Sequence, residues 1–192
     1  MSDHPLVPLL RRALEARSPV RVEEPGRRLA AVALVVAPSP DSVLLIRRAE
    51  RTGDPWSGQV GLPGGGFDPA DVELLATAMR ETLEEVGVDL RGAECVGALD
   101  DVAPRTPVLP PVTVRPFVFC LPSRPALTLS AEVARAFWTE LALLRRPAAR
   151  VTRSLPILGT PRTITGYLAG GDFIWGMTER ILTPFLELTQ PT

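Results

Sequence analysis

The residues of this chain best suited to chemistry are three closely spaced glutamates, Glu81, Glu84 and Glu85. On a helix, their spacing of i, i+3 and i+4 places them on one face within about one turn. Carboxylates this close repel one another, and a hard divalent cation removes the repulsion by taking their oxygens as ligands. Arg80 stands four residues before Glu84, where it is placed to hold one carboxylate. The spacing predicts a metal site, and its structural alternative is a solvated acidic helix face.

Helix-end signals stand on both sides of this cluster. Asp68 is suited to be an N-cap, Pro69 to the first helical position, and Asp71 to complete a capping box. Gly87 is suited to a left-handed C-cap. Apolar residues recur between these ends at three- and four-residue spacing, which predicts one buried stripe. Its members are Val72, Leu75, Met79, Leu83 and Val86. We therefore expect a capped helix that directly follows the glycine-rich residues 64–66.

Composition limits which groups can carry the chemistry. All 21 basic residues are arginine, so a Schiff-base lysine and a P-loop lysine are both absent. The only histidine is His4, near the terminus, and Cys95 and Cys120 lack a metal-ligand spacing. A net charge of -1 gives no basic field for nucleic acid. Any catalytic or binding chemistry must therefore be carried by carboxylates and arginines.

The start of the chain shows no secretory signal pattern. The longest uncharged apolar run near it, residues 29–37, is too short to cross a bilayer. We therefore expect a cytoplasmic protein with no membrane partner.

Periodicity and turn residues indicate an α/β fold. Strands are expected at residues 29–37, 42–48, 95–102, 112–121, 150–155 and 162–168, with the first two and the last two forming hairpins. Helices are expected at residues 5–16, from Ser130, after residues 137–141, and at 174–188 with a break at Pro184. Strands around one central helix imply a mixed sheet packed between helices. We divide the chain into a helix and linker, 1–28, and a single domain, 29–192.

Several residues outside the acidic helix are candidates for substrate binding. Arg47 and Arg48 emerge at the end of a strand and suit diphosphate oxygens. Trp56 lies in a turn-rich segment. Its side chain could stack on a nucleotide base or hold the loop in place by packing, and the sequence favours neither role over the other. Residues 104–111 form a proline-rich loop of the kind that flanks binding sites.

Together with Gly65 and Gly66, the run Arg80-Glu81-Thr82-Leu83-Glu84-Glu85-Val86-Gly87 resembles the signature of the Nudix hydrolases. Asp71 stands where that signature has an early glutamate, and one extra residue precedes Arg80. This lengthening is similar to that of the coenzyme A pyrophosphatase branch. The resemblance implies a Nudix-type α/β/α sandwich with a central mixed sheet. It also implies hydrolysis of a nucleoside diphosphate linked to another group, with Mg2+ or Mn2+.

The same resemblance implies roles for individual residues. Glu81, Glu84 and Glu85 would bind the metal with the help of a backbone carbonyl at Gly65, and Arg80 would orient a glutamate. Two residues are candidates for the general base, Glu81 and Glu132. Glu132 is also explained as an early-helix glutamate that the helix dipole favours.

The substrate class that the resemblance implies is a small nucleotide, with coenzyme A or a derivative first. ADP-ribose or a nucleoside triphosphate is the alternative substrate, and a domain that senses a ligand without turnover is the alternative class. Oligomeric state stays open, with a homodimer under consideration, because Phe173 and Trp175 suit a core or an interface equally well.

Overall fold

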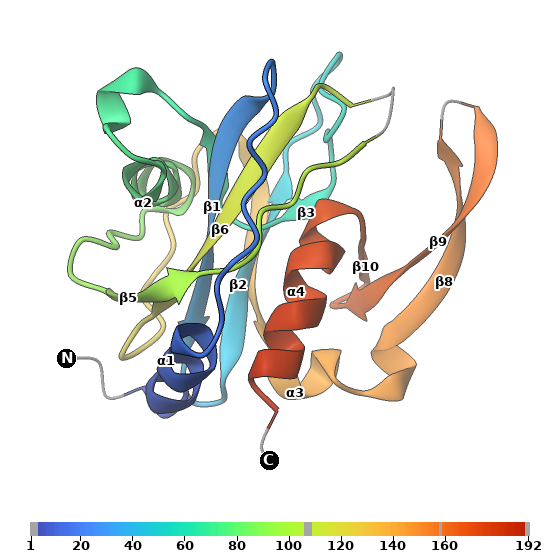
Figure 1. The fold of residues 1–192 in the computed structure, drawn as a ribbon. Coiled ribbons are helices and arrows are strands. Elements are labelled where there is room, and N and C mark those ends of the chain that lie inside the picture. The colour runs from blue at the N-terminus through green and yellow to red at the C-terminus, as the bar shows by residue number, and fades with distance from the viewer. Residues whose placement is uncertain (1–3, 106–108, 158, 191–192) are drawn as a thin grey trace.

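The computed structural model describes residues 4–105, 109–157 and 159–190. A seven-stranded mixed sheet lies between helices, and a three-stranded sheet stands beside it (Figure 1). The strands of the large sheet are β1 (Arg28–Ala37), β2 (Ser42–Arg48), β3 (Val60–Gly61), β4 (Gly64–Gly66), β5 (Glu94–Ala98), β6 (Val112–Cys120) and β7 (Val133–Glu140). The expected α/β class, with a mixed sheet flanked by helices, is confirmed.

Strand β1 is the centre of the large sheet, whose main order is β3-β2-β1-β6-β5. It runs parallel to β6 along nearly its whole length and antiparallel to β2 and β4. Its side chains alternate between two hydrophobic clusters, with Leu34 and Val36 on one face and Ala33 and Val35 on the other. Burial on both faces explains the near-continuous apolar run of this segment.

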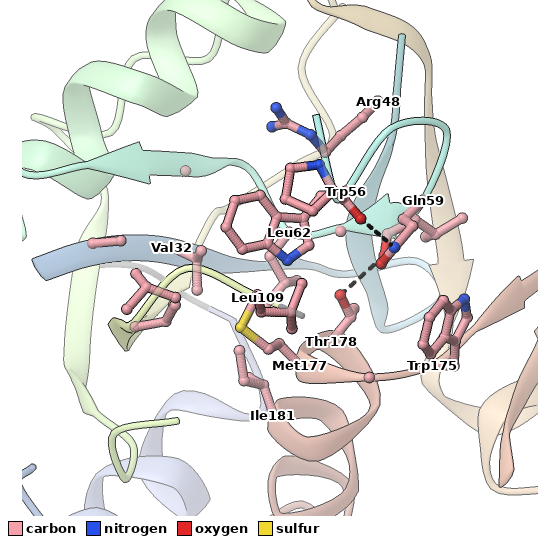
Figure 2. Close-up of a pocket in the computed structure, with 18 of the residues that line it drawn as sticks. Val32, Arg48, Trp56, Gln59, Leu62, Leu109, Trp175, Met177, Thr178 and Ile181 are labelled. Carbon is pink, nitrogen blue, oxygen red and sulfur yellow. Dashed lines mark hydrogen bonds between the residues drawn. The ribbon is translucent and has the colours of Figure 1, made fainter. Parts of the chain in front are cut away.

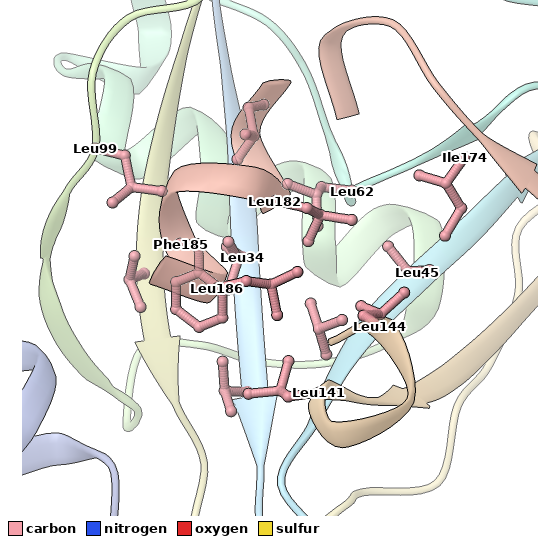
Figure 3. Close-up of a cluster of buried hydrophobic side chains, with 14 of the residues drawn as sticks. Leu34, Leu45, Leu62, Leu99, Leu141, Leu144, Ile174, Leu182, Phe185 and Leu186 are labelled. Atoms are coloured by element: carbon pink, nitrogen blue, oxygen red, sulfur yellow. The ribbon is translucent and has the colours of Figure 1, made fainter. Parts of the chain in front are cut away.

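Helices cover both faces of this sheet (Figure 1). Helix α2 (Leu74–Val86) packs on one face, and α1 (Val7–Glu15) and α4 (Met177–Leu188) pack on the other. Leu34 and Leu45 of the sheet contribute to the same core as Leu182 and Phe185 of α4 (Figure 3). Each large apolar side chain buried in this way contributes roughly 1.5–3 kcal/mol. Short helical segments complete the chain: η1 (Pro69–Asp71), α3 (Leu141–Leu144) and η2 (Pro147–Ala149).

The three-stranded sheet forms an arm that stands to one side of the large sheet (Figure 1). It consists of β8 (Arg150–Ile157), β9 (Thr160–Ala169) and β10 (Asp172–Ile174), all antiparallel. The hairpin expected over residues 150–155 and 162–168 is confirmed. In the same described ranges, none of the helices combines the length and apolarity that a bilayer crossing requires.

The acidic helix is shorter than the sequence predicted. The caps are present, since Asp68 and Asp71 form a reciprocal capping box and Gly87 has a left-handed φ of 72°. However, the box closes the separate turn η1, and the chain breaks at Val72, which has a φ of 66°, before α2 begins. The capped segment is therefore a turn followed by a helix.

The stripe predicted for this helix is also corrected. Val72 is 87% exposed and Leu83 is 43% exposed. The other three predicted residues face the core: Val86 is fully buried, and Leu75 and Met79 pack against the same cluster. The buried positions of α2 also include Thr77, Ala78, Thr82 and Glu85. Short side chains at most of these positions allow the helix to approach β1 closely, and the helix is thereby rotated so that Glu85 faces the protein.

The helix expected from Ser130 is wrong. Residues 130–132 form a turn in which Ser130 Oγ accepts a hydrogen bond from the backbone N–H of Glu132, at 3.2 Å. Strand β7 follows and pairs antiparallel with β2 along an edge that would otherwise be open. Sheet pairing outweighs the local cap signal here, which is the usual way tertiary structure overrides propensity.

The C-terminal helix differs from its prediction at two points. Its first expected residue, Ile174, is the last residue of β10, and α4 begins at Met177, after Gly176. Pro184 lies inside α4 without ending it.

Candidate functional site

Asp71 connects the η1 turn to helix α2. Its carboxylate accepts hydrogen bonds from the backbone N–H of Asp68 (3.2 Å) and the hydroxyl of Thr77 (2.8 Å). It also accepts from Arg80 Nε and Nη2, at 2.8 and 3.0 Å. The guanidinium of Arg80 holds the pKa of Asp71 well below its usual range. Asp71 is therefore more than a cap, because it fixes the position of Arg80.

Arg80 in turn holds the glutamates that follow it. Its Nη1 donates to Glu81 Oε1 at 2.7 Å and to Glu84 Oε2 at 3.4 Å. Its Nη2 reaches the carbonyl oxygen of Gly66 in β4 at 3.3 Å. The expected contact between Arg80 and Glu84 is present, although the Glu84 side chain is 60% exposed. One arginine thus connects the helix, the turn and the glycine strand.

Two of the three glycines of β4 are required, because β1 lies directly against Gly64 and the Glu81 carboxylate lies directly against Gly65. A Cβ atom on Gly65 would stand 2.4 Å from Glu81 Cδ and within 2.6 Å of both carboxylate oxygens. The backbone N–H of Gly64 donates to Glu85 Oε2 at 2.9 Å, and a Cβ there would lie 2.3 Å from the carbonyl oxygen of Ala31. Bare backbone at Gly65 therefore lets Glu81 reach the strand, and bare backbone at Gly64 lets β4 lie close to β1.

Burial makes ionisation of these two glutamates costly. It raises the pKa of Glu85 to about 7. The hydrogen bond from the Gly64 N–H and the charge of Arg48 lower this pKa, whereas repulsion from Glu81 and Glu132 raises it further. Burial also raises the pKa of Glu81, although the bond from Arg80 opposes the rise. A cation bound near these carboxylates would relieve this cost.

The donor set suits a hard divalent cation such as Mg2+ or Mn2+, because every candidate ligand is an oxygen. In the conformation described, Glu81 and Glu84 turn toward Arg80, and Glu85 turns toward Gly64. Across the described ranges, no three His, Cys, Asp or Glu side chains converge on one point. Metal binding would therefore require new rotamers of these side chains, and the chemistry of the ligands, rather than their present geometry, provides the fit.

Glu132 lies near this cluster although it is distant in sequence. Its charge contributes to the raised pKa of both Glu81 and Glu85. The carboxylate itself is paired with Arg51 at 3.1 Å, and both side chains are about half exposed. The turn before β7 thus brings in a fourth carboxylate, at a place that the expected helix did not foresee.

Arg47 and Arg48 diverge, because successive side chains of a strand point to opposite faces. Arg48 donates to Asp54 at 2.9 Å, and its Nη1 lies 3.9 Å from Glu85 Oε1. Arg47 instead pairs with Asp172 of β10 at 3.4 Å. The structure therefore brings Arg48 to the carboxylate cluster and leaves Arg47 at the base of the arm.

A cavity of about 1140 Å³ opens beside the glycine strand. Its walls come from the start of α4, the arm, β1 and the segment that carries Trp56 (Figure 2). Trp56 packs against the cluster of Ala30, Val112 and Val114, as Met177 also does. Among the described residues, its buried indole Nε1 has no hydrogen-bond partner. This packing favours a structural role for Trp56 in holding its loop in place, although the residue also lines the cavity.

Several wall residues were missed in the sequence, because nothing local marks them. Met177 and Ile181 come from α4, and Ile157 and Ile164 come from the arm. Leu109 belongs to the proline-rich loop that was expected to flank a site, and residues 106–108 of that loop lie outside the described residues. Only the tertiary fold brings these segments to one cavity.

The NUDIX domain, as a family pattern, matches residues 26–157. The uncharacterized Nudix hydrolase NudL of Photorhabdus laumondii is 31% identical over 175 residues, which cover 90% of each protein. The uncharacterized protein C14C4.10c of Schizosaccharomyces pombe is 46% identical over 110 residues, covering 55% of this chain and 33% of that protein. The chain thus spans about a third of the yeast relative's length.

Solved structures show the same fold. A MutT/nudix family protein from Enterococcus faecalis superposes with a TM-score of 0.56 at 20% identity, covering 88% of this chain and 63% of the other. The NUDIX domain of Shewanella oneidensis NrtR, solved with ADP ribose, superposes with a TM-score of 0.50 at 23% identity. The match covers 62% of this chain and 79% of the other.

Proposed function

The chain belongs to the Nudix family of hydrolases, and we propose that it hydrolyses the pyrophosphate bond of a dinucleotide-sized compound, coenzyme A or a derivative of it first. The observation that carries this proposal is the placement of Glu81 against Gly65. It sets a carboxylate, held by Arg80, on the strand that also forms a wall of the 1140 Å³ cavity. Carboxylate chemistry and a space for a large ligand therefore meet at β4.

Cavity size supports a large substrate. Ligand sites commonly measure roughly 300–1,000 Å³, and this cavity exceeds that range. The walls are mainly apolar, with Trp56, Met177 and Ile181 among them. A substrate with a long, weakly polar portion beyond the diphosphate uses this space better than a nucleoside triphosphate does.

Mg2+ or Mn2+ is the metal we propose, held by Glu81, Glu84 and Glu85 with the carbonyl of Gly65. When bound, it would neutralise charge on the diphosphate and lower the pKa of a coordinated water. The protein's own residues have separate tasks: Arg80 orients Glu81, and Arg48 holds the position of Glu85. Arg47, Arg48 and Trp56 were expected to contact substrate; Arg48 and Trp56 line the cavity, and Arg47 does not.

Glu81 is the general base we favour. Its carboxylate is held by Arg80 against Gly65, on the strand that forms a wall of the cavity. Glu132 is the second candidate, but its carboxylate is occupied by Arg51. A base at Glu132 would first have to exchange that ion pair for a water molecule.

Two alternatives deserve a direct test. ADP-ribose fits the same cavity chemistry, and a Nudix domain of similar fold has been solved with that ligand. A domain that senses a ligand without turnover would need the cavity but not the three glutamates. The cytoplasmic location, the homodimer and the division at residue 28 stay predictions.

A product screen with Mg2+ tests the proposal across coenzyme A, ADP-ribose, NADH and nucleoside triphosphates. We expect cleavage of coenzyme A to adenosine 3′,5′-bisphosphate and phosphopantetheine, with Glu84→Gln nearly inactive. Glu187→Gln, a change of an exposed glutamate at the far end of α4, is the matched control. If no compound is cleaved while Glu84→Gln and the parent bind the same ligand equally, the domain is a sensor and the enzyme proposal is rejected.

A further inference from the structure

The charged side chains that line the cavity are all arginines. Arg28, Arg48 and Arg162 contribute to its walls, and none of the described lining residues is an aspartate or a glutamate. This is a marked local excess of positive charge in a chain whose net charge is -1. An electropositive cavity attracts an anionic ligand.

Among the residues that the structure describes, two of these three charges have no carboxylate partner. Arg48 is neutralised locally by Asp54 at 2.9 Å and by Glu85 at 3.9 Å. Within the described ranges, neither Arg28 nor Arg162 has a carboxylate within 4.0 Å. By contrast, Arg150 of the same arm pairs with Glu179 at 2.8 Å. The unpaired charges of the cavity are therefore Arg28 and Arg162.

Arg28 and Arg162 reach the cavity from two different elements, β1 and the arm. Arg28, Ala30 and Val32 alternate along β1 and all line the cavity. Ala30 pairs with Gly66, so Arg28 lies two residues, or about 7 Å, beyond that pair. Arg162 enters from the arm, together with Thr163. Both arginines thus line the cavity, and neither forms an ion pair with Glu81 or Glu85 among the described residues.

We propose that Arg28 and Arg162 form a second anion subsite, which selects substrates that carry a phosphate in addition to the scissile diphosphate. The assignment rests on the proposed function, because that function places the scissile diphosphate at Glu81. Two guanidinium groups match the charge of a phosphomonoester, which is about −1.5 to −2 at neutral pH, and arginine suits phosphate geometry. Both arginines are exposed to solvent, so their attraction for a phosphate is that of partly screened charges.

Matched substrate pairs test the subsite with the full chain and Mg2+. The pairs are coenzyme A against 3′-dephospho-coenzyme A, and NADPH against NADH. We expect the parent to show higher kcat/KM for the phosphorylated member. In R28Q/R162Q we expect kcat/KM for that member to fall about 10–100-fold, as for lost charge-assisted hydrogen bonds, with the other member changed by less than about twofold. Arg146→Gln, at an exposed arginine away from the cavity, is the control.

Calorimetric binding of adenosine 3′,5′-bisphosphate and AMP separates the subsite from the activity. If the chain hydrolyses its substrates but R28Q/R162Q keeps the parent's preference, the two arginines are solvated surface charges and the subsite is rejected. If no substrate is cleaved, yet the parent binds the bisphosphate more tightly and the variant does not, the subsite stands and the proposed hydrolysis fails. Equal binding of both nucleotides by the parent rejects the subsite.

Discussion

Arg80 binds Asp71 through two parallel contacts, with Nε 2.8 Å from Oδ1 and Nη2 3.0 Å from Oδ2. The pair bridges nine residues of sequence and crosses the break at Val72. It therefore provides the connection between η1 and α2 that a continuous helix would have supplied. The same guanidinium holds Glu81, so the geometry of the acidic cluster depends on an aspartate outside the helix.

The first prediction concerns this pair. In Asp71→Asn, the amide can accept only one of the two bonds and carries no charge. We expect a loss of about 1–3 kcal/mol in unfolding free energy and roughly a 10–100-fold loss of kcat/KM, as when a supporting partner of a ligand is removed. Thermal unfolding and steady-state kinetics measure the two effects.

Asp68→Asn is the matched control, since asparagine caps a helix as well as aspartate does and residue 68 does not touch Arg80. The sign of the pH effect follows from the lowered pKa of Asp71. The stabilisation is complete above the ordinary aspartate pKa and is lost as pH falls toward the much lower folded-state pKa, so the stability difference between the two proteins should begin to narrow below about pH 4. A difference in unfolding free energy between the parent and Asp71→Asn that stays constant down to pH 3 would contradict this role for the ion pair.

The second prediction concerns the backbone under Glu81. In Gly65→Ala, the new methyl group would occupy the place of the Glu81 carboxylate, 2.4 Å from its Cδ. A displacement of about 1 Å in an active group can cost on the order of 100-fold in rate, and we expect at least that loss in kcat/KM. Gly66→Ala is the control, because a Cβ there meets nothing within 4 Å. Equal activity of the two variants would show that Glu81 does not act from its place on Gly65.

How much of this site was visible in the sequence depends on whether the signal was local. The glutamate spacing, the capping box and the C-cap at Gly87 are local, and the structure contains each of them. The break at Val72 was not foreseen, because nothing in the sequence shows that the capping box closes a turn of its own. The contact between Arg80 and Asp71 depends on that break.

The fold divides in the same way. Strands β1 and β2 could be predicted because their apolar runs reflect burial on both faces. Strand β7 was missed, because Ser130 followed by Glu132 is typical of a helix start and outweighed the strand-favouring residues at the end of the segment. Its pairing with β2 is a long-range interaction. The cavity is less predictable still, since α4, the arm and Leu109 meet there only after folding.

The third prediction concerns metal binding without turnover. A cation that binds only the folded state stabilises it by about 2.7 kcal/mol at a hundred times its Kd. We expect millimolar Mg2+ or Mn2+ to raise the Tm, EDTA to reverse the rise, and Glu84→Gln to diminish it. Glu187→Gln should respond as the parent does, since that residue is exposed on α4. A Tm unaffected by either cation would contradict the assignment of the three glutamates.

The last prediction uses the cost of ionising Glu85. Its pKa of about 7 in the folded protein, against an ordinary 4.5, means that the folded state binds a proton more tightly than the unfolded state does. The stability of the metal-free parent should therefore fall as pH rises from about 4.5 to about 7. In Glu85→Gln the amide oxygen can still accept the bond from Gly64, but the charge is absent. We expect this variant to be more stable than the parent at pH 8 without metal, by up to about 3 kcal/mol.

Low pH and added Mg2+ provide two controls for the comparison of Glu85→Gln with the parent. Below about pH 5 the parent's Glu85 is protonated in the folded state, so the variant should lose its advantage there. Added Mg2+ should likewise favour the parent, because a bound cation removes the cost of the charge. Chemical denaturation between pH 4.5 and 8.5, with EDTA and with Mg2+, measures both trends. A variant that is less stable than the parent at pH 8 in EDTA would mean that Arg48 and Gly64 already compensate the buried charge, and that no cation is needed to hold it.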